Sequence, residues 1–167
     1  KKEPPSYLSG QILSKAFGLS RTAIWKHINA IKEMGYAIEA SPAKGYRLNL
    51  DSLPFNAFEI NSNLKTSFIG RNLFFYKETG STNDAAKEFA ANDAKEGFAV
   101  VADSQTKGKG RLGRRWESPA GANIYTSVIL RPDISPVFAP QLTLVAAVAV
   151  AETISKFLNT GSGYKPE

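Results

Sequence analysis

The chain has 167 residues and a net charge of +6, enough length for one ordinary domain or for one domain with a small module. It contains no cysteine, which excludes a disulfide framework and a cysteine-based metal site. No stretch resembles a signal peptide, and the most apolar run, Leu142 to Ala151, is too short to span a bilayer. We therefore expect a cytoplasmic protein without a membrane partner.

The positive charge is uneven along the chain. Residues 1–50 hold eight Lys or Arg and three Asp or Glu, and the loop 107–115 holds five cations. The rest of the chain carries more acids than bases. Two anion-binding sites of different kinds follow as a hypothesis.

The first two predicted elements are helices. Ser9 is a good N-cap for a helix over Gly10–Phe17, and Ser20 is a good N-cap for a second helix that Gly35 would end. Two short helices joined by a glycine-containing turn predict a helix-turn-helix. On the second helix, one apolar stripe repeats at helical spacing; it consists of Ile24, Ile28 and Ile31.

A hairpin follows the two helices. The segments Tyr36–Ala40 and Gly45–Leu48 flank a Ser-Pro-Ala-Lys turn, so the module is winged. A small packing domain without a ligand is the alternative, but the charge excess favours DNA. Because the start of a recognition helix meets the major groove, we predict DNA contacts there. The predicted residues are Ser20, Arg21, Thr22 and Lys26; His27, the only histidine, would pack or contact a phosphate.

The remaining elements mix helix and strand after a linker, Asn49 to Pro54. No internal repeat is evident. We expect a short helix over Phe55–Leu64, strand Leu73–Glu78, helix Ala85–Ala91, strand Phe98–Ala102, strand Ile124–Leu130 and a long, largely buried helix over Pro140–Leu158.

The turn before the helix Ala85–Ala91 is rich in side chains that form hydrogen bonds. One Ser or Thr would satisfy the N-cap, but Ser81, Thr82 and Asn83 follow one another. The surplus favours contact with a ligand. Gln105, at the end of the next strand, would project near the same place.

The loop 107–116 (Lys-Gly-Lys-Gly-Arg-Leu-Gly-Arg-Arg-Trp) holds three glycines, five cations and no acid. Glycine lets the backbone approach a ligand closely, and clustered cations repel one another unless an anion binds. We therefore predict a mobile loop, between two strands of one sheet, that binds a strongly anionic ligand. Its G-x-G-x-x-G spacing does not indicate a dinucleotide site, because Pro119 and Gly121 break the helix that such a motif requires.

Together these pieces resemble the bifunctional biotin protein ligase and biotin operon repressor family. The resemblance covers essentially the whole chain, and it implies an α+β protein. A winged helix-turn-helix domain would occupy residues 1–50, and part of a class II aminoacyl-tRNA synthetase-like α/β catalytic domain would occupy residues 51–167. The segments that carry the resemblance are 20–28 (Ser-Arg-Thr-Ala-Ile-Trp-Lys-His-Ile), 44–46 (Lys-Gly-Tyr), 80–83 (Gly-Ser-Thr-Asn), Gln105 with 108–116, and 121–125 (Gly-Ala-Asn-Ile-Tyr).

The family implies both ligase and repressor functions. A member forms biotinyl-5′-AMP from biotin and ATP with Mg²⁺, and transfers biotin to a lysine of the biotin carboxyl carrier protein of acetyl-CoA carboxylase. With biotinyl-5′-AMP as corepressor it binds operator DNA as a homodimer, and Lys44 of the wing would contribute to that contact. By similarity the biotin or adenylate site consists of Ser81, Thr82, Asn83, Gln105, Lys109, Gly110, Arg111, Trp116 and Asn123, with Lys109 and Arg111 as catalytic residues.

Two features depart from the family pattern. Lys109 stands where a common form of the loop has Arg, so a compact ammonium group replaces a guanidinium that could form a bidentate contact. The chain also stops at Glu167, where family members continue into a Lys-Trp-Pro-Asn-Asp segment whose lysine binds biotin and phosphate. We therefore expect a fragment that is inactive as a ligase by itself. The alternative function is a transcriptional regulator whose second domain senses a small acid and has no ligase activity.

Overall fold

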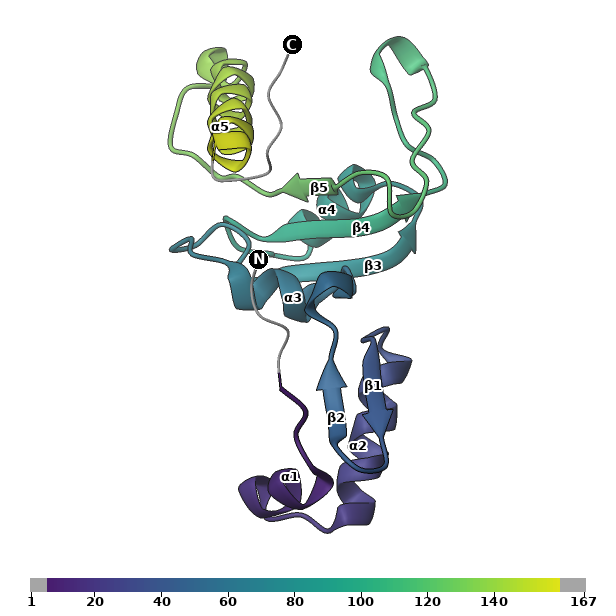
Figure 1. Ribbon diagram of the computed structural model, residues 1–167. Helices are drawn as coiled ribbons and strands as arrows, with labels where there is room; N and C mark the ends of the chain where they lie inside the picture. Colours follow the sequence, from purple (N-terminus) through teal and green to yellow (C-terminus); the bar gives the residue numbers. More distant parts are fainter. Residues whose placement is uncertain (1–5, 160–167) are drawn as a thin grey trace. The chain divides into compact units, whose positions relative to one another are not determined.

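The structure is a computed structural model that describes residues 6–159 (Figure 1). Contacts divide these residues into two compact units, one ending at Leu130 and the other beginning at Arg131. The first unit holds two helices and a hairpin, followed by a small sheet with its own helices. Helices and strands are both present, as the predicted α+β class requires.

The two N-terminal helices are α1 (Gly10–Phe17) and α2 (Arg21–Glu33). Each begins at a predicted serine cap, because the hydroxyl of Ser9 accepts from the N–H of Ile12 at 3.2 Å and that of Ser20 accepts from the N–H of Ala23 at 3.1 Å. Gly18 ends α1 with φ 65°, a left-handed conformation that favours glycine. Ile24 is the buried residue of α2, which confirms the predicted apolar stripe.

The predicted wing is the antiparallel hairpin of β1 (Ile38–Ser41) and β2 (Gly45–Leu48). Strand β1 begins two residues later than the expected Tyr36. The chain before α1 adds a contact that the sequence did not predict, since Leu8 and Tyr46 exchange backbone hydrogen bonds of 2.8 and 2.9 Å. The N-terminal module is thus a winged helix-turn-helix whose wing is tied to the segment before its first helix.

The linker contains a short 3₁₀ helix, Leu50–Ser52, and leads to α3 (Ala57–Asn63). This helix is shorter than the predicted Phe55–Leu64. Asn56 caps it, with Oδ1 accepting from the N–H of Glu59 at 2.9 Å, and Leu64 is already extended. Asparagine is a strong N-cap, so it sets the helix start inside the apolar pattern.

A three-stranded sheet organises the central part of the chain. Its strands are β3 (Leu73–Thr79), β4 (Ala99–Gln105) and β5 (Tyr125–Val128), in that spatial order. Strands β3 and β4 are parallel and joined by α4 (Thr82–Ala91), whereas β4 and β5 are antiparallel. The predicted arrangement, with the glycine loop between two strands of one sheet, is confirmed, and the next regular strand or α-helix after that loop is β5.

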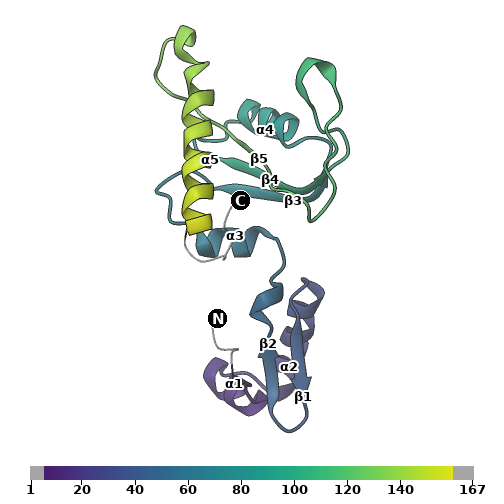
Figure 2. The same cartoon turned by 45° about the horizontal axis from the view of Figure 1, so that its top comes forward.

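Helix α4 covers one face of this sheet (Figure 2). Ala85 and Ala86 of α4 pack with Val100, which is fully buried on the central strand. The ring of Phe89 lies 5.4 Å from that of Phe74 and 4.8 Å from that of Phe98. This core packs α4 against the central strand β4.

The second unit contains a 3₁₀ helix, Pro136–Phe138, and α5 (Gln141–Asn159). The predicted helix is present, but the expectation that it is largely buried was wrong, because most of its apolar side chains, Leu144 and Phe157 among them, are exposed. The expectation that this run is too short to span a bilayer was also wrong: Pro136–Asn159 is long enough to cross a membrane, and an 18-residue window within it has a mean hydropathy of 1.7. One such helix is weak evidence, since core helices pass the same test.

Candidate functional site

The predicted turn and Gln105 lie at the same edge of the sheet. Strands β3 and β4 are parallel, and Thr79 at the end of β3 pairs with Gln105 at the end of β4. The chain leaves β3 through Gly80 and enters α4 at Thr82, with Ser81 as the N-cap. The carboxyl edge of parallel strands, where a helix begins, is the usual place for a ligand in α/β sheets.

A chain of hydrogen bonds joins these residues. The backbone N–H and the hydroxyl of Thr82 both donate to Oε1 of Gln105, at 2.8 and 3.2 Å. The Thr82 hydroxyl in turn accepts from the hydroxyl of Ser127 on β5 at 3.0 Å. On the other side, Nε2 of Gln105 donates to the hydroxyl of Ser118 at 3.1 Å. One glutamine therefore links α4, β4, β5 and the segment after the glycine loop.

This arrangement assigns the capping role differently from the sequence expectation. Ser81 is the N-cap by position, yet its hydroxyl makes no capping hydrogen bond, and Gln105 satisfies the first N–H of α4 instead. The amide of Gln105 has a second N–H beyond the one donated to Ser118. Asn83, in the first turn, is exposed. Ser81, Asn83 and the second amide N–H are thus the donors and acceptors that this edge offers to a ligand.

Lys109 of the glycine loop pairs with the first turn of α4. Its Nζ lies 2.7 and 2.6 Å from the two carboxylate oxygens of Asp84. This hydrogen bond holds the pKa of Asp84 below its usual value, and the charges of Lys109, Lys87 and Lys107 act in the same direction. Three cations surround one carboxylate, so the field at this edge remains positive and suits an anionic ligand.

The glycine loop forms a narrow hairpin at its base. The N–H of Gly110 donates to the carbonyl of Arg114 at 2.7 Å, and the N–H of Trp116 donates to the carbonyl of Gly108 at 2.9 Å. A 3₁₀ turn, Arg111–Gly113, makes the tip, where Gly113 has φ 72° (Figure 1). The side chain of Arg111 lies outside the described part of the structure, so its role stays a prediction, as does the mobility of the loop.

Trp116 and Asn123 occupy separate parts of this region. Trp116 is exposed and lines a pocket of the hairpin with Gly110, Leu112, Arg114 and Arg115. The side chain of Asn123 donates to the hydroxyl of Tyr125 at 3.2 Å, and that hydroxyl donates to the carbonyl of Pro119 at 3.1 Å. In the described residues, no hydrogen bond joins Asn123 or the Trp116 side chain to Thr82 or Gln105.

Sequence reasoning missed a buried carboxylate at the same edge. Asp103 on β4 is buried, and its Oδ1 accepts from the N–H of Gly121 at 2.9 Å. Its other oxygen pairs with Lys77, which lowers the pKa of Asp103. The bond to Gly121 ties the segment that carries Asn123 to the central strand. The available signal was an acid at the end of the apolar run of β4.

Across residues 6–159, no three His, Cys, Asp or Glu side chains form a possible metal site.

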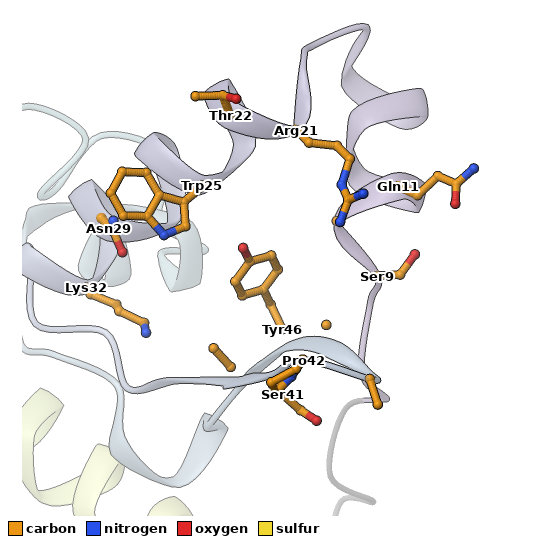
Figure 3. A pocket seen from close by; sticks show the side chains of 14 residues that line it. Ser9, Gln11, Arg21, Thr22, Trp25, Asn29, Lys32, Ser41, Pro42 and Tyr46 are labelled. Atoms are coloured by element: carbon orange, nitrogen blue, oxygen red, sulfur yellow. The ribbon is translucent and has the colours of Figure 1, made fainter.

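The N-terminal module contains an open groove of about 700 Å³ between α2 and the wing (Figure 3). Among the described residues that line it, none is acidic, and two are cations, Arg21 and Lys32. The helix side consists of Arg21, Thr22, Trp25, Asn29 and Lys32, and the remaining lining residues are Ser9, Gly10, Gln11, Ala40, Ser41, Pro42, Ala43, Gly45 and Tyr46.

The groove includes only part of the predicted DNA-binding set. Arg21 and Thr22 line it, whereas the hydroxyl of Ser20 is used as the cap of α2. Lys26 and His27 are exposed but do not line the groove, and Lys44 lies with its Nζ 5.8 Å from the ring centre of Tyr7. Trp25, Asn29 and Lys32 also line the groove and were not among the predicted DNA contacts, although Arg21, Trp25 and Asn29 recur at the spacing of one helix face.

Comparisons with known proteins agree with both halves of this description. The HTH domain family matches residues 1–47, and the biotin/lipoate A/B protein ligase family matches residues 75–167. The chain is 47% identical over 150 residues to the bifunctional ligase/repressor BirA of Bacillus subtilis (strain 168), covering 90% of this chain and 46% of that protein. It is 35% identical over 148 residues to the protein of the same name in Escherichia coli (strain K12), covering 89% and 44%.

The chain thus spans about half the length of the curated relatives it matches. Among solved structures, a biotin protein ligase from Aquifex aeolicus in complex with biotin and ATP is 40% identical, with a TM-score of 0.45 over 52% of this chain and 35% of that chain. The ligase family match alone covers more than half of the sequence. This chain, with a helix-turn-helix module before its central sheet, belongs to the biotin/lipoate A/B protein ligase family.

Proposed function

We propose that this chain forms the DNA-binding domain, residues 1–50, and part of the catalytic domain, residues 51–167, of a biotin protein ligase that also represses transcription. The observation that carries the ligase proposal is the sheet edge at which the Thr82–Gln105 hydrogen bonds lie beside the cationic loop. The relatives named as bifunctional ligase/repressor support the same pairing of activities. The domain boundary follows the end of the wing at Leu48.

The proposed reaction has two steps. A carboxylate oxygen of biotin attacks the α-phosphorus of ATP, releasing pyrophosphate and leaving biotinyl-5′-AMP. A lysine amine of the biotin carboxyl carrier protein then attacks the biotinyl carbonyl carbon, and AMP leaves. Both steps need positioning and charge stabilisation more than covalent help from the protein. Mg²⁺ enters with ATP.

Residues of this chain supply the positioning in two groups. Ser81, Asn83 and Gln105 would orient the neutral part of biotin through hydrogen bonds at the start of α4. Lys109 and Arg111 would offset the repulsion between the carboxylate and the phosphate, and act as the catalytic residues. Lys109 is paired with Asp84 in the structure, so an incoming anion would compete with that carboxylate for Lys109 or bind beside it.

The remaining predicted site residues would enclose the product. Biotinyl-5′-AMP is a mixed anhydride that water hydrolyses, so exclusion of water matters. Gly110 and Trp116 lie in the hairpin, and Asn123 lies on the segment tied down by Asp103. We propose that the hairpin folds over the adenylate. Thr82 would act mainly through Gln105, since both of its described donors already bond to that residue.

The repressor half of the proposal rests on the winged helix-turn-helix and on its groove, whose described lining residues include no acid. Biotinyl-5′-AMP would be the corepressor, and a homodimer would bind operator DNA in the cytoplasm. Ser20, Arg21, Thr22, Lys26, His27 and, in the wing, Lys44 remain the predicted DNA contacts. Exposed cations such as Lys26 would contact phosphates, while groove residues would face bases.

The decisive experiment is biotin-dependent exchange of pyrophosphate into ATP by the full-length protein. Lys109→Ala should lower the exchange rate about 10²–10³-fold, because one preorganised charge contact is lost. Lys95→Ala, which removes an exposed lysine after α4, is the matched control and should change little. Wild-type protein that binds biotin but exchanges no pyrophosphate would favour the alternative, a regulator that senses a small acid. Equal exchange by the Lys109→Ala and wild-type proteins would reject the role of Lys109.

A further inference from the structure

The recognition helix places an exposed indole inside the groove of the N-terminal module. Trp25, in the second turn of α2, keeps 55% of its surface exposed. Figure 3 shows its ring beside the open space that Lys32 and Tyr46 also border. A large aromatic side chain left half in water, on a concave surface, marks a place where contact with a partner would stabilise binding.

The neighbours of Trp25 indicate what that partner is. Arg21 and Asn29 lie one helical turn before and after it on the same face, and Lys32 follows in the next turn. Arginine binds phosphates or guanine, and asparagine binds adenine through a bidentate hydrogen bond. The described lining residues include no acid that would repel a polyanion. The stripe therefore has the chemistry of a surface that contacts double-stranded DNA.

Within such a stripe the indole of Trp25 can contact only some of the chemical groups that DNA exposes. Its ring carries one N–H donor and a large apolar face, so it cannot neutralise a phosphate. The thymine 5-methyl group is the apolar feature that the major groove presents to a protein. Packing of the ring against that methyl group would cover both apolar surfaces, while Arg21 and Asn29 bond to the polar edges beside it.

We propose that Trp25 is a specificity-determining residue that contacts the 5-methyl group of a thymine in the major groove. The inference rests on the proposed DNA binding by this module. It adds a preference for thymine at one position of each operator half-site. This assignment also brings the wing hairpin close to the DNA strand that carries the thymine, since Ser41, Pro42 and Tyr46 form the opposite side of the groove.

The test compares thymine with deoxyuridine, which differs only by the methyl group. The full-length protein, with biotin and ATP, selects a duplex from a randomised library, and each thymine of that duplex is then replaced in turn. For wild type, loss of a contacted methyl group should weaken binding about fourfold at one thymine per half-site. For Trp25→Ala the same replacement should cause no further loss, because its partner is already missing.

Two further variants keep the result interpretable. Trp25→Phe retains a ring and should keep part of the sensitivity to deoxyuridine, even if the alanine variant fails to fold. Met34→Ala removes another exposed apolar side chain of this module outside the groove, so its deoxyuridine profile should equal that of wild type. Identical deoxyuridine profiles for wild type and both Trp25 variants would overturn the assignment while DNA binding itself stands. Failure of the wild-type protein to select any duplex would overturn both proposals.

Discussion

Gln105 offers the sharpest test of how the candidate site is built. Its Oε1 accepts two hydrogen bonds from Thr82, one of them from the first N–H of α4, and its amide donates to Ser118. Gln105→Leu keeps a similar volume but removes all three bonds. Thr82 is buried, so its N–H would lose its partner without ready access to water.

The expected loss follows from that unpaired donor. A buried unsatisfied donor costs about 1–3 kcal/mol, and loss of a helix cap costs a similar amount, so we expect about 2 kcal/mol in the free energy of unfolding. This corresponds to about 4–8 °C in the melting temperature of a domain of 150–250 residues. Urea unfolding of the full-length protein measures it, together with amide exchange of residues 81–91.

Two controls separate capping from other effects of the change. Gln141→Leu makes the same substitution at an exposed position of α5 and should leave stability within about 0.5 kcal/mol. Gln105→Glu keeps an acceptor oxygen for Thr82 and adds a negative charge that favours a helix N-terminus, so it should protect the first turn of α4 better than Gln105→Leu does. An unchanged urea midpoint for Gln105→Leu would refute the capping role.

Other predictions concern the loop, its ion pair and the DNA-binding helix. Residues 107–116 should gain amide protection when biotin or biotinyl-5′-AMP binds; equal protection in both states would indicate a fixed turn. Lys109 lowers the pKa of Asp84, so the ion pair is fully formed above the usual aspartate pKa. As pH falls the pair persists below that usual value, and it breaks only when Asp84 is protonated near its lowered pKa. Lys109→Met should raise that pKa in an NMR titration, and an unchanged value would contradict the pairing. Lys26→Ala should reduce the salt dependence of log K for operator DNA by about one, and Arg21→Ala should weaken operator binding; unchanged affinity and slope in both variants would reject these contacts.

Local chemistry in the sequence predicted most of the elements. Serine caps, a glycine at φ 65° and the hairpin turn are decided by neighbours in the chain, so Ser9, Ser20 and Gly18 indicated the helix-turn-helix directly. The place of Gln105 beside the turn followed from one further fact, that parallel strands end at the same edge of a sheet.

Contacts between distant residues could not be predicted in the same way. The Lys109–Asp84 pair and the Asp103–Gly121 bond join residues far apart in sequence, and no pattern of residue types specifies such partners. The groove around Trp25 required the wing to be placed opposite α2. For α5 the apolar composition predicted the helix correctly but gave no information about what covers it.

The glycines of the loop differ in which residues can replace them. A side chain at Gly108 would collide with the carbonyl of Trp116 and the hydroxyl of Ser118, whereas Gly113 has open space around it and is constrained only by its φ of 72°. Asparagine tolerates that conformation, so natural variation and protein engineering should admit it at position 113 and exclude every side chain at position 108. A fluorescent or spin label would accordingly be attached at exposed Leu112, next to the permissive glycine, to report hairpin movement.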